Sequence, residues 1–296
     1  MELQENLKEG NSVLIVNLKG GMGNQMFQYA LYKVLSMRGK RVMLDVSHIK
    51  NDMQLINRST IFDAYKLDRH YVDFGRVFNK IISRFLMPVF KRIVGLYMEK
   101  EEGTLDPELI NLKKGYLEGY WQTERYFKEY RTEICKDFSL LQDLSEENKK
   151  MLEKIAAEPC AVSLHIRLGD YTTPVNEELF GGICTEEYYK NAVEHIKQKY
   201  ENAKFFVFSN GEHNITGILP DINYELVNIN DENTGWADMY LMSQCDHNII
   251  ANSSFSWWGA WLNQNENKTV IAPQKWINGQ NMTDICPDEW VRISVV

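Results

Sequence analysis

The sequence has few of the features that mark disulfide-rich, fibrous or membrane-spanning proteins. Its 296 residues include 7 prolines and 5 cysteines, and no C-x-x-C pair occurs. Because the cysteines are odd in number and scattered, they argue against a disulfide framework and a zinc site and indicate a reducing compartment. We expect neither a membrane span nor a signal peptide, since no uncharged apolar run reaches about 18 residues and the start, MELQENLKEGNS, has no apolar run.

An excess of positive charge is also missing. The formal charge is −8 at pH 7, from 33 basic and 41 acidic residues, so the chain has no general attraction to polyanions and any phosphate must be bound by a local site. Disorder is excluded because 44% of the residues are hydrophobic and 12% are aromatic. We therefore expect a cytoplasmic globular protein that does not bind nucleic acid.

Residues 74–98 contain no acidic residue. Basic residues punctuate an apolar segment there: Arg76, Lys80, Arg84, Lys91 and Arg92. One interpretation is peripheral contact with an anionic membrane, at its inner face. The other, which the pattern favours, is a core helix kinked at Pro88 with solvated basic edges.

The order of apolar runs predicts an α/β protein. Val13–Leu18 is a β-branched run that ends in a glycine cluster, as buried parallel strands do, and the helical pattern that follows ends at Gly39. A second alternating series begins near Cys160. We therefore predict two Rossmann-like domains facing a cleft, at 1–155 and 156–296, the first with a helical insertion.

The individual elements are predicted from the same periodicity. We expect strands at 13–18, 41–46, 115–122, 161–168, 205–209, 225–229, 247–252 and 269–273. Helices are expected at 26–40, 145–158, 185–200, 236–244 and 254–264, and the region between residues 47 and 150 is otherwise mostly helical in pattern.

Glycines follow the first predicted strand, in GGMGNQ. A glycine-rich turn that enters a helix leaves backbone N–H groups available for a phosphate, and Gly21 and Gly23 are the candidates. Met26 stands where a dinucleotide fingerprint has its third glycine, although Asp45 lies at about the distance of a ribose-binding acid. The alternative is a pair of glycines that merely permits a tight turn.

A second group of polar residues ends the strand at 161–168, in HIRLGDY. Alternation places His165 and Arg167 on the same side of the strand, where both can face a ligand. Arginine grips phosphate bidentately and stabilises charge on a diphosphate leaving group. A structural pair of Arg167 with Asp170 remains the alternative.

Two later strands also end in small polar residues, in FSNG (208–211) and ANSSFSWWGAWLN (251–263). Ser253 and Ser254 at a helix N-terminus can bind phosphate or serve as ordinary caps. Trp257, Trp258 and Trp261 have spacing more typical of core packing than of a sugar platform. We expect no metal site, because no carboxylate cluster has metal-ligand spacing.

Taken together, GGMGNQMFQYA, HIRLGDY, FSNG and DMYLMSQCDHNIIANSSFSWWGAWLN resemble the bacterial α-1,2-fucosyltransferases of glycosyltransferase family 11. The resemblance implies a GT-B-like pair of Rossmann domains. It also implies GDP-β-L-fucose as donor substrate, no cofactor, and inverting, metal-independent transfer to the 2-hydroxyl of a terminal galactose. The carboxyl-terminal domain would hold the donor and the amino-terminal domain the acceptor glycan, whose attachment to a lipid stays open.

The resemblance also assigns roles to residues. Arg167 would hold the β-phosphate, His165 would approach the nucleoside, Asp238 would bind guanine and Asn24 would lie near the reacting centre; a carboxylate suits guanine because N1–H and N2–H are both donors. The remaining donor-binding candidates are Gly21, Gly23, Ser209, Asn210, Asn252, Ser253, Ser254 and Phe255.

One position departs from the family pattern. Leu168 stands where relatives usually have a second arginine, so a second cationic phosphate contact is absent or comes from elsewhere. Asp170 is the first candidate for the general base, with Glu177 and Glu178 as rivals. Two other function classes stay open: an NAD-type oxidoreductase built on Gly21, Gly23 and Asp45, and a catalytically inactive protein that binds nucleotide sugars.

Overall fold

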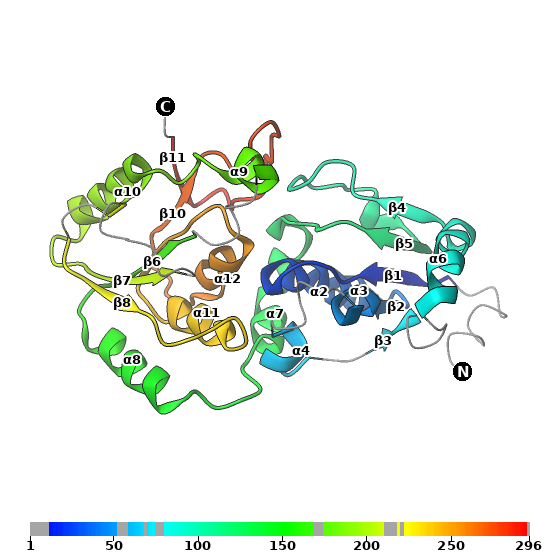
Figure 1. Ribbon diagram of the computed structural model, residues 1–296, viewed down its shortest axis with the longest axis horizontal. Helices are drawn as coiled ribbons and strands as arrows, with labels where there is room; N and C mark the ends of the chain where they lie inside the picture. Colours follow the sequence, from blue (N-terminus) through cyan, green and yellow to red (C-terminus); the bar gives the residue numbers. More distant parts are fainter. Residues whose placement is uncertain are drawn as a thin grey trace. The chain divides into compact units, whose positions relative to one another are not determined.

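The computed structural model describes residues 12–51, 59–67, 70–74, 80–167, 174–209, 218–219 and 222–294. The chain divides into two compact units, Met1–Leu141 (unit 1) and Gln142–Val296 (unit 2). Each unit is an α/β structure built on a parallel sheet (Figure 1).

Unit 1 contains a five-stranded sheet in the order β3-β2-β1-β5-β4, and every pair of neighbours is parallel. Its strands are β1 (Leu14–Asn17), β2 (Val42–Asp45), β3 (Tyr71–Val72), β4 (Leu96–Met98) and β5 (Gly115–Glu118). Its helices are α2 (Met22–Met37), α3 (Ser47–Asn51), α4 (Ile61–Ala64), α6 (Lys80–Val94) and α7 (Arg131–Asp137), with short 3-10 turns at Leu109–Asn111, Glu124–Tyr126 and Lys128–Tyr130.

Unit 2 contains a six-stranded parallel sheet in the order β11-β10-β9-β6-β7-β8. Its strands are β6 (Ala161–Ile166), β7 (Lys204–Ser209), β8 (Tyr224–Val227), β9 (His247–Ile249), β10 (Val270–Pro273) and β11 (Val291–Ile293). Its helices are α8 (Glu146–Ala157), α9 (Pro174–Phe180), α10 (Glu186–Lys199), α11 (Gly235–Ser243) and α12 (Ser254–Leu262). This order is that of a doubly wound dinucleotide-binding fold, in which the direction of winding reverses between β6 and β9.

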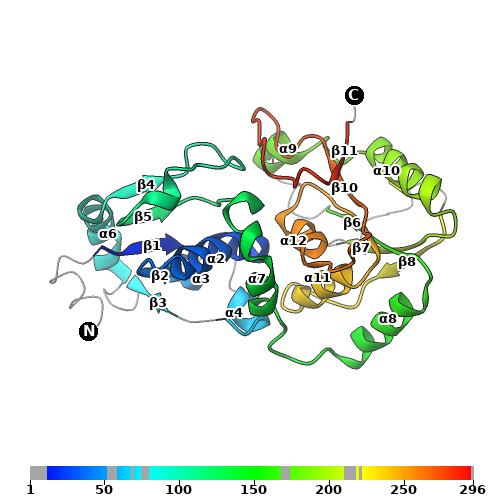
Figure 2. The same ribbon diagram turned by 180° about the vertical axis from the view of Figure 1, so that it is seen from behind.

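Helices cover both faces of the unit 2 sheet, as the two opposite views show (Figures 1 and 2). Phe205 and Val207 of β7 pack with α10, whereas Phe206 and Phe208 pack with α8 and α11. Successive side chains of a strand point to opposite faces, so the continuous apolar run of β7 is buried on both sides.

The structure confirms each of the predicted strands and helices, with ends that differ by no more than four residues. The described part of the region after residue 47 contains the helices α3, α4, α6 and α7, in line with its predicted helical pattern, but the sequence analysis missed the short strands β3 and β4 of the unit 1 sheet. The sequence analysis also missed β11. These strands have two or three residues, which is too short for alternation to be recognised.

Helix α8 belongs to unit 2, which begins at Gln142, whereas the predicted domains 1–155 and 156–296 assign this helix to the first domain. Met151 and Ile155 of α8 pack against Phe206, Phe208 and Val227. The charged outer face of this amphipathic helix gives it the composition of a linker, but its apolar face completes the core of unit 2.

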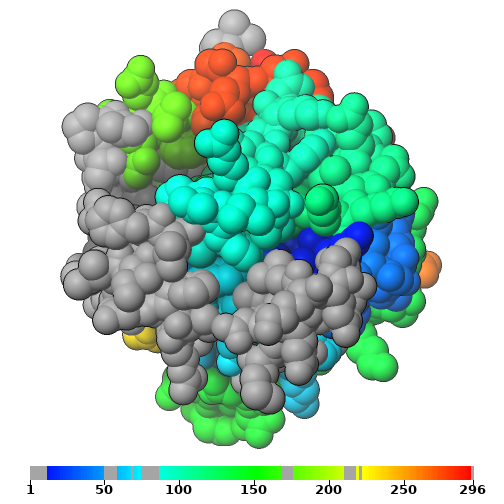
Figure 3. Space-filling view, turned by 90° about the vertical axis from the view of Figure 1, so that its right-hand side faces the viewer, coloured from blue at the N-terminus to red at the C-terminus, as the bar shows by residue number. Residues whose placement is uncertain are grey.

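Within the acid-free segment, residues 80–94 form α6, with Pro88 inside it, and residues 96–98 form β4. Phe90 packs in the unit 1 core, as the core-helix interpretation expects. Val89, Ile93, Leu96 and Met98 are nonetheless exposed, and the surface of this segment lies towards the viewer in Figure 3. Within the described ranges, no helix is long and apolar enough to cross a membrane.

A buried amide network fixes the interior of unit 2. Asn248 of β9 is fully buried, and its Nδ2 donates to Ser163 Oγ (2.7 Å) and to the carbonyl oxygen of Met242 (2.8 Å). Its Oδ1 accepts from Asn263 Nδ2 at 2.8 Å. One side chain therefore joins β9, β6 and the carboxyl ends of α11 and α12.

We expect Asn248→Leu to lower the free energy of unfolding of unit 2 by about 2–5 kcal/mol, because leucine leaves several buried polar groups without partners. Scanning calorimetry would measure the change. Asn233→Leu, the same substitution at an exposed position, is the control and should change stability by less than about 0.5 kcal/mol. Similar transitions for the two variants would contradict a structural role for the network.

Candidate functional site

Arg167 lies at the point where the unit 2 sheet reverses its winding. It follows β6, and its Nη1 donates to Ser253 Oγ at 2.9 Å, so the carboxyl end of β6 is joined to the start of α12. Ser253 is the N-cap of α12, where its hydroxyl oxygen accepts from the backbone nitrogen of Phe255 at 3.3 Å. A guanidinium beside a helix N-terminus creates a positive site that suits an anion.

His165 stands beside Arg167 as a neutral side chain. It is 5% exposed, and burial together with the Arg167 charge lowers the pKa of His165 to about 3. Its Nδ1 is buried and has no hydrogen-bond partner among the described residues. A neutral imidazole can offer one donor and one acceptor to a ligand without adding a second positive charge.

Ser209 provides a second buried polar atom on the neighbouring strand. It is paired in register with Ile166, at the carboxyl end of β7. Its Oγ is buried and, within the described part of the chain, has no hydrogen-bond partner. Buried polar atoms are normally satisfied, so His165 Nδ1 and Ser209 Oγ make these strand ends a candidate ligand site.

Phe255 connects the beginnings of two helices with His165. Its ring lies 5.8 Å from the His165 ring, and it is 3.8 Å from the position that a Cβ atom on Gly235 would take, at the first turn of α11. Thus the start of α11, the start of α12 and the end of β6 lie close together. Ser254, the first residue of α12, is half-buried in the same place.

Asp238 lies in the first turn of α11, which begins at Gly235 with Thr234 as its N-cap. Asp238 is therefore inside the helix and is not its N-cap. Its Oδ1 accepts from Asn230 Nδ2 at 2.6 Å, and burial raises its pKa to about 6 despite this bond. No described residue gives Asp238 a cationic partner, and a buried carboxylate of this kind can bind a ligand that presents N–H donors.

Asn252 has mainly a structural role here. Its Nδ2 donates to the carbonyl oxygens of Trp276 (3.1 Å) and Phe180 (3.3 Å), and its Oδ1 accepts from Cys184 Sγ (3.4 Å). The side chain therefore connects three segments directly before the Ser253 cap. Its contribution to ligand binding would be the placement of that cap.

In unit 1, the glycine candidates lie at the start of α2. Gly21 is its N-cap, Gly23 is buried within its first turn, and Asn24 Oδ1 accepts from Gln122 Nε2 at 2.7 Å. Asp45 is fully buried and accepts from Tyr116 Oη (2.6 Å) and Ser47 Oγ (2.5 Å). These contacts occupy Asp45 and speak against a ribose-binding role.

The tryptophans of α12 are core residues, as their spacing predicts. Trp257 and Trp258 are fully buried and Trp261 is 2% exposed. Glu177 and Glu178 on α9 are exposed, whereas Asn210, Leu168 and Asp170 lie outside the described residues. In the described ranges no cluster of three or more His, Cys, Asp or Glu residues could hold a metal ion.

Several residues of interest were missed by the sequence analysis. Asn230 accompanies Asp238, and Asn148 Nδ2 donates to Asn230 Oδ1 at 2.8 Å. At the end of β1, Asn17 is fully buried, and neither of its amide atoms has a partner in the described part of the structure. A polar residue that ends an apolar strand was the available signal for Asn17.

Comparisons with known proteins identify the same family that the polar motifs resemble. The profile of glycosyl transferase family 11 matches residues 2–294. An alpha-1,2-colitosyltransferase of Escherichia coli is 34% identical over 301 residues, covering 95% of this chain and 99% of that protein. The O-antigen biosynthesis glycosyltransferase WbnK of E. coli is 32% identical over 304 residues, covering 93% and 99%. The galactoside alpha-(1,2)-fucosyltransferase 2 of Pongo pygmaeus is 24% identical over 256 residues, covering 83% and 68%.

We expect Ser253→Ala to lower the free energy of unfolding of unit 2 by about 0.5–2 kcal/mol, because it removes the cap of α12. The matched control is Ser254→Ala at the next position, which is not the cap and should change stability by less than about 0.5 kcal/mol. Thermal unfolding of both variants makes the comparison. Equal transition temperatures for the two would show that the Ser253 hydroxyl does not hold the start of α12.

Proposed function

Because the chain belongs to glycosyltransferase family 11, we propose that it transfers L-fucose from GDP-β-L-fucose to the 2-hydroxyl of a terminal galactose. The reaction would be inverting and independent of metal ions, forming an α-1,2 linkage. The observation that carries the proposal is the hydrogen bond between Arg167 and the Ser253 cap, at the winding reversal of unit 2. Ligands of doubly wound sheets bind at this place.

The chemistry of unit 2 supports a nucleoside diphosphate as the donor. In the proposed reaction, the acceptor hydroxyl oxygen attacks C1 of the sugar, the bond from C1 to the β-phosphate oxygen breaks, GDP leaves, and a general base takes the hydroxyl proton. Asp170 is our first candidate for that base, with Glu177 and Glu178 as rivals. Arg167 and the N–H groups at the start of α12 would stabilise the charge that develops on the diphosphate. Neutral His165 and buried Asp238 would contact the nucleoside, with Asp238 on guanine.

The donor sugar has a second candidate. A relative with 34% identity is an alpha-1,2-colitosyltransferase, and colitose differs from L-fucose by the absence of the 3-hydroxyl. A site that pairs buried polar groups with that hydroxyl would select strongly for fucose, whereas an apolar site would accept both sugars. GDP-colitose is therefore the alternative donor.

The other classes have less support. The NAD-type oxidoreductase would need Asp45 on a ribose, and Asp45 is occupied by Tyr116 and Ser47. A catalytically inactive protein that binds nucleotide sugars is separated from an enzyme by a test of turnover. We also propose that the fold is GT-B-like, that the protein is cytoplasmic, and that its acceptor is an oligosaccharide that ends in galactose.

The direct test is to incubate the purified protein with lactose and either GDP-fucose or GDP-colitose, and to identify products by mass spectrometry and linkage by NMR. We expect α-1,2-linked product, with the same rate in EDTA as in Mg²⁺ or Mn²⁺. Loss of activity in EDTA that Mg²⁺ restores would reject the metal-independent mechanism. Binding of GDP without turnover on a glycan array with galactose termini would favour the inactive protein.

We expect Arg167→Lys to reduce kcat/KM by on the order of 10²-fold, nearly as much as Arg167→Ala, because a lysine cannot reproduce the planar fork of donors on a phosphate. Steady-state kinetics with GDP-fucose would measure the effect, and thermal unfolding would verify that both variants are folded. A Lys variant that retains more than about a tenth of the wild-type kcat/KM would remove Arg167 from the leaving-group site.

We expect Asp238→Asn to weaken GDP binding by about 1.5–3 kcal/mol, the usual contribution of a hydrogen bond to a charged group. Since the pKa of Asp238 is about 6, the wild type should also lose GDP affinity as the pH falls from 7 to 5 and the carboxylate is protonated. Calorimetric titration with GDP measures both effects. The Asn variant controls for protonation of the nucleotide itself. If the GDP affinity of the wild type and that of the Asn variant change with pH in the same way, another residue recognises guanine.

A further inference from the structure

The segment that follows β5 has a strained backbone. Trp121 has a φ of +58°, and within the described chain no other non-glycine residue has a positive φ. A bulky side chain in this conformation is strained and persists where its surroundings fix it; such residues cluster at functional sites. The segment lies where the winding of the unit 1 sheet reverses, between β1 and β5.

Glu99 holds this segment through two backbone groups. Its Oε2 accepts from the Tyr120 nitrogen at 2.6 Å and its Oε1 accepts from the Trp121 nitrogen at 2.9 Å. There is no room for a side chain at Gly119, since a Cβ atom there would lie 2.5 Å from Glu99 Cβ. Both oxygens of one carboxylate therefore determine the direction of the backbone at residues 120 and 121.

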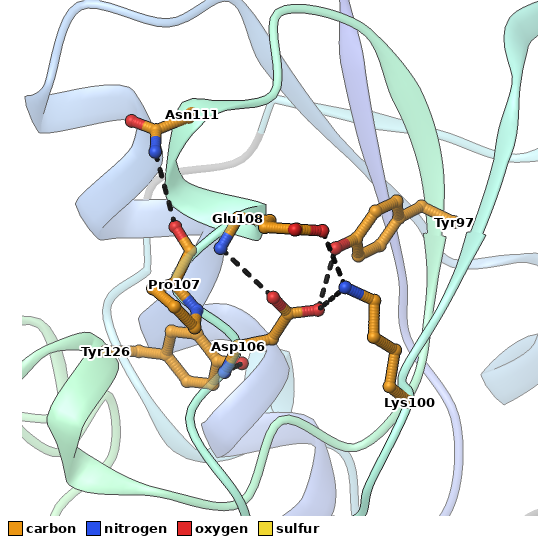
Figure 4. Close-up of polar contacts among 7 residues, drawn as sticks. All are labelled: Tyr97, Lys100, Asp106, Pro107, Glu108, Asn111 and Tyr126. Atoms are coloured by element: carbon orange, nitrogen blue, oxygen red, sulfur yellow. Dashed lines mark hydrogen bonds and ion pairs between the residues drawn. The ribbon is translucent and has the colours of Figure 1, made fainter.

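A second set of contacts anchors the loop after Glu99 to the same segment (Figure 4). Asp106 accepts from Tyr97 Oη at 2.7 Å and forms an ion pair with Lys100 at 3.3 Å, and its backbone nitrogen donates to Tyr126 Oη at 2.9 Å. The Tyr126 ring packs edge-on against Trp121 at 6.3 Å. Trp121 is thus held on its backbone and on its side chain.

Tyr120 and Gln122, the neighbours of Trp121, lie against the residues that follow β1. Lys19 Nζ is 4.6 Å from the centre of the Tyr120 ring, and a Cβ atom on Gly20 would be 3.4 Å from that ring. Gln122 Nε2 donates to Asn24 Oδ1 at 2.7 Å. No described residue uses the Asn24 Nδ2 donors or the Gln122 Oε1 acceptor.

We propose that Tyr120, Gln122 and Asn24 form a contact surface for the acceptor sugar, and that Glu99 and Trp121 are positioning residues which hold it in place. This inference rests on the proposed function, for which it specifies the acceptor site. An aromatic ring provides an apolar face for a sugar ring, and paired amides provide a donor and an acceptor for its hydroxyls.

Charges of both signs lie near this surface. The carboxyl groups of Glu99 and Glu102 act electrostatically on Tyr120, and Lys19 lies over its ring, so these charges give no excess of positive charge that would select a diphosphate. Asn17 adds independent support. It lies one residue beyond the paired Val16 and Leu117, at the end of β1, and its buried amide has no partner among the described residues. Such a group indicates a bound ligand or water at these strand ends.

The test is Tyr120→Ala, with binding of lactose followed by saturation-transfer NMR in the absence of donor. We expect the lactose signal to disappear and the acceptor KM to rise at least tenfold, while calorimetric GDP affinity stays unchanged. Tyr130→Ala is the matched control, because a cation, Arg38, also lies over that ring, at 5.8 Å. The control should leave lactose binding and acceptor KM unchanged.

Three results would overturn the site: lactose binding that survives Tyr120→Ala, weaker GDP binding in that variant, or no lactose signal with the wild type. The proposed function fails separately. If the wild type binds lactose through Tyr120 but forms no glycosidic product, the sugar site stands and the transfer reaction is rejected.

The positioning role of Glu99 is tested by the pH dependence of the acceptor KM. Burial, with a smaller contribution from the Glu102 charge, raises the pKa of Glu99 to about 7, although the backbone donors of Tyr120 and Trp121 and the Lys19 charge lower it. The Glu99 charge also acts on Tyr126. Protonation removes one of its two acceptor oxygens, so the wild-type acceptor KM should rise as the pH falls from 8 to 6. Glu99→Gln should show a raised KM at every pH with kcat less affected. A pH profile parallel to that of the wild type would reject this role.

Discussion

Both units depend on the same constraint, which is that neighbouring strands at a reversal of winding diverge at their carboxyl ends and must be joined by side chains. In unit 1 Gln28 makes this connection, because its Oε1 accepts from the Lys19 nitrogen (2.9 Å) and its Nε2 donates to the Gly119 carbonyl oxygen (3.1 Å). In unit 2 the bond from Arg167 to Ser253 joins β6 to the segment after β9. Backbone groups at such ends have no further strand to pair with, so side-chain partners are required.

The two connections differ in charge. Gln28 is fully buried and its two bonds use both ends of the neutral amide. Arg167 connects through its Nη1, which donates to Ser253 Oγ. The first connection is structural, whereas the second places a positive charge beside a helix start. This difference is why we propose the diphosphate in unit 2 and the neutral sugar in unit 1.

The sequence predicted the long elements well because their periodicity is strong. Residues 161–166 (AVSLHI) and 204–209 (KFFVFS) are mainly apolar, and both form strands whose central residues are buried. Arg167, His165 and Ser253 were found because polar residues at the ends of such strands stand out. The short strands β3, β4 and β11 gave no pattern, and α8 was placed in the first domain because its packing partners are distant in sequence. Nothing in the sequence around Trp121 indicates its backbone conformation, which Glu99 helps to fix from its position directly after β4.

The outermost strands of both sheets are short. In unit 1 the edges are β3 and β4, with two and three residues, and in unit 2 they are β11 and β8, with three and four. An edge strand presents unpaired N–H and C=O groups to any other extended chain, and a long one is a template for aggregation. Because each edge offers at most a few such groups, another chain could gain little by adding itself to the sheet. The brevity of these strands therefore protects the protein against fibril formation while its parallel sheets assemble, a process that is slow because their contacts are distant in sequence.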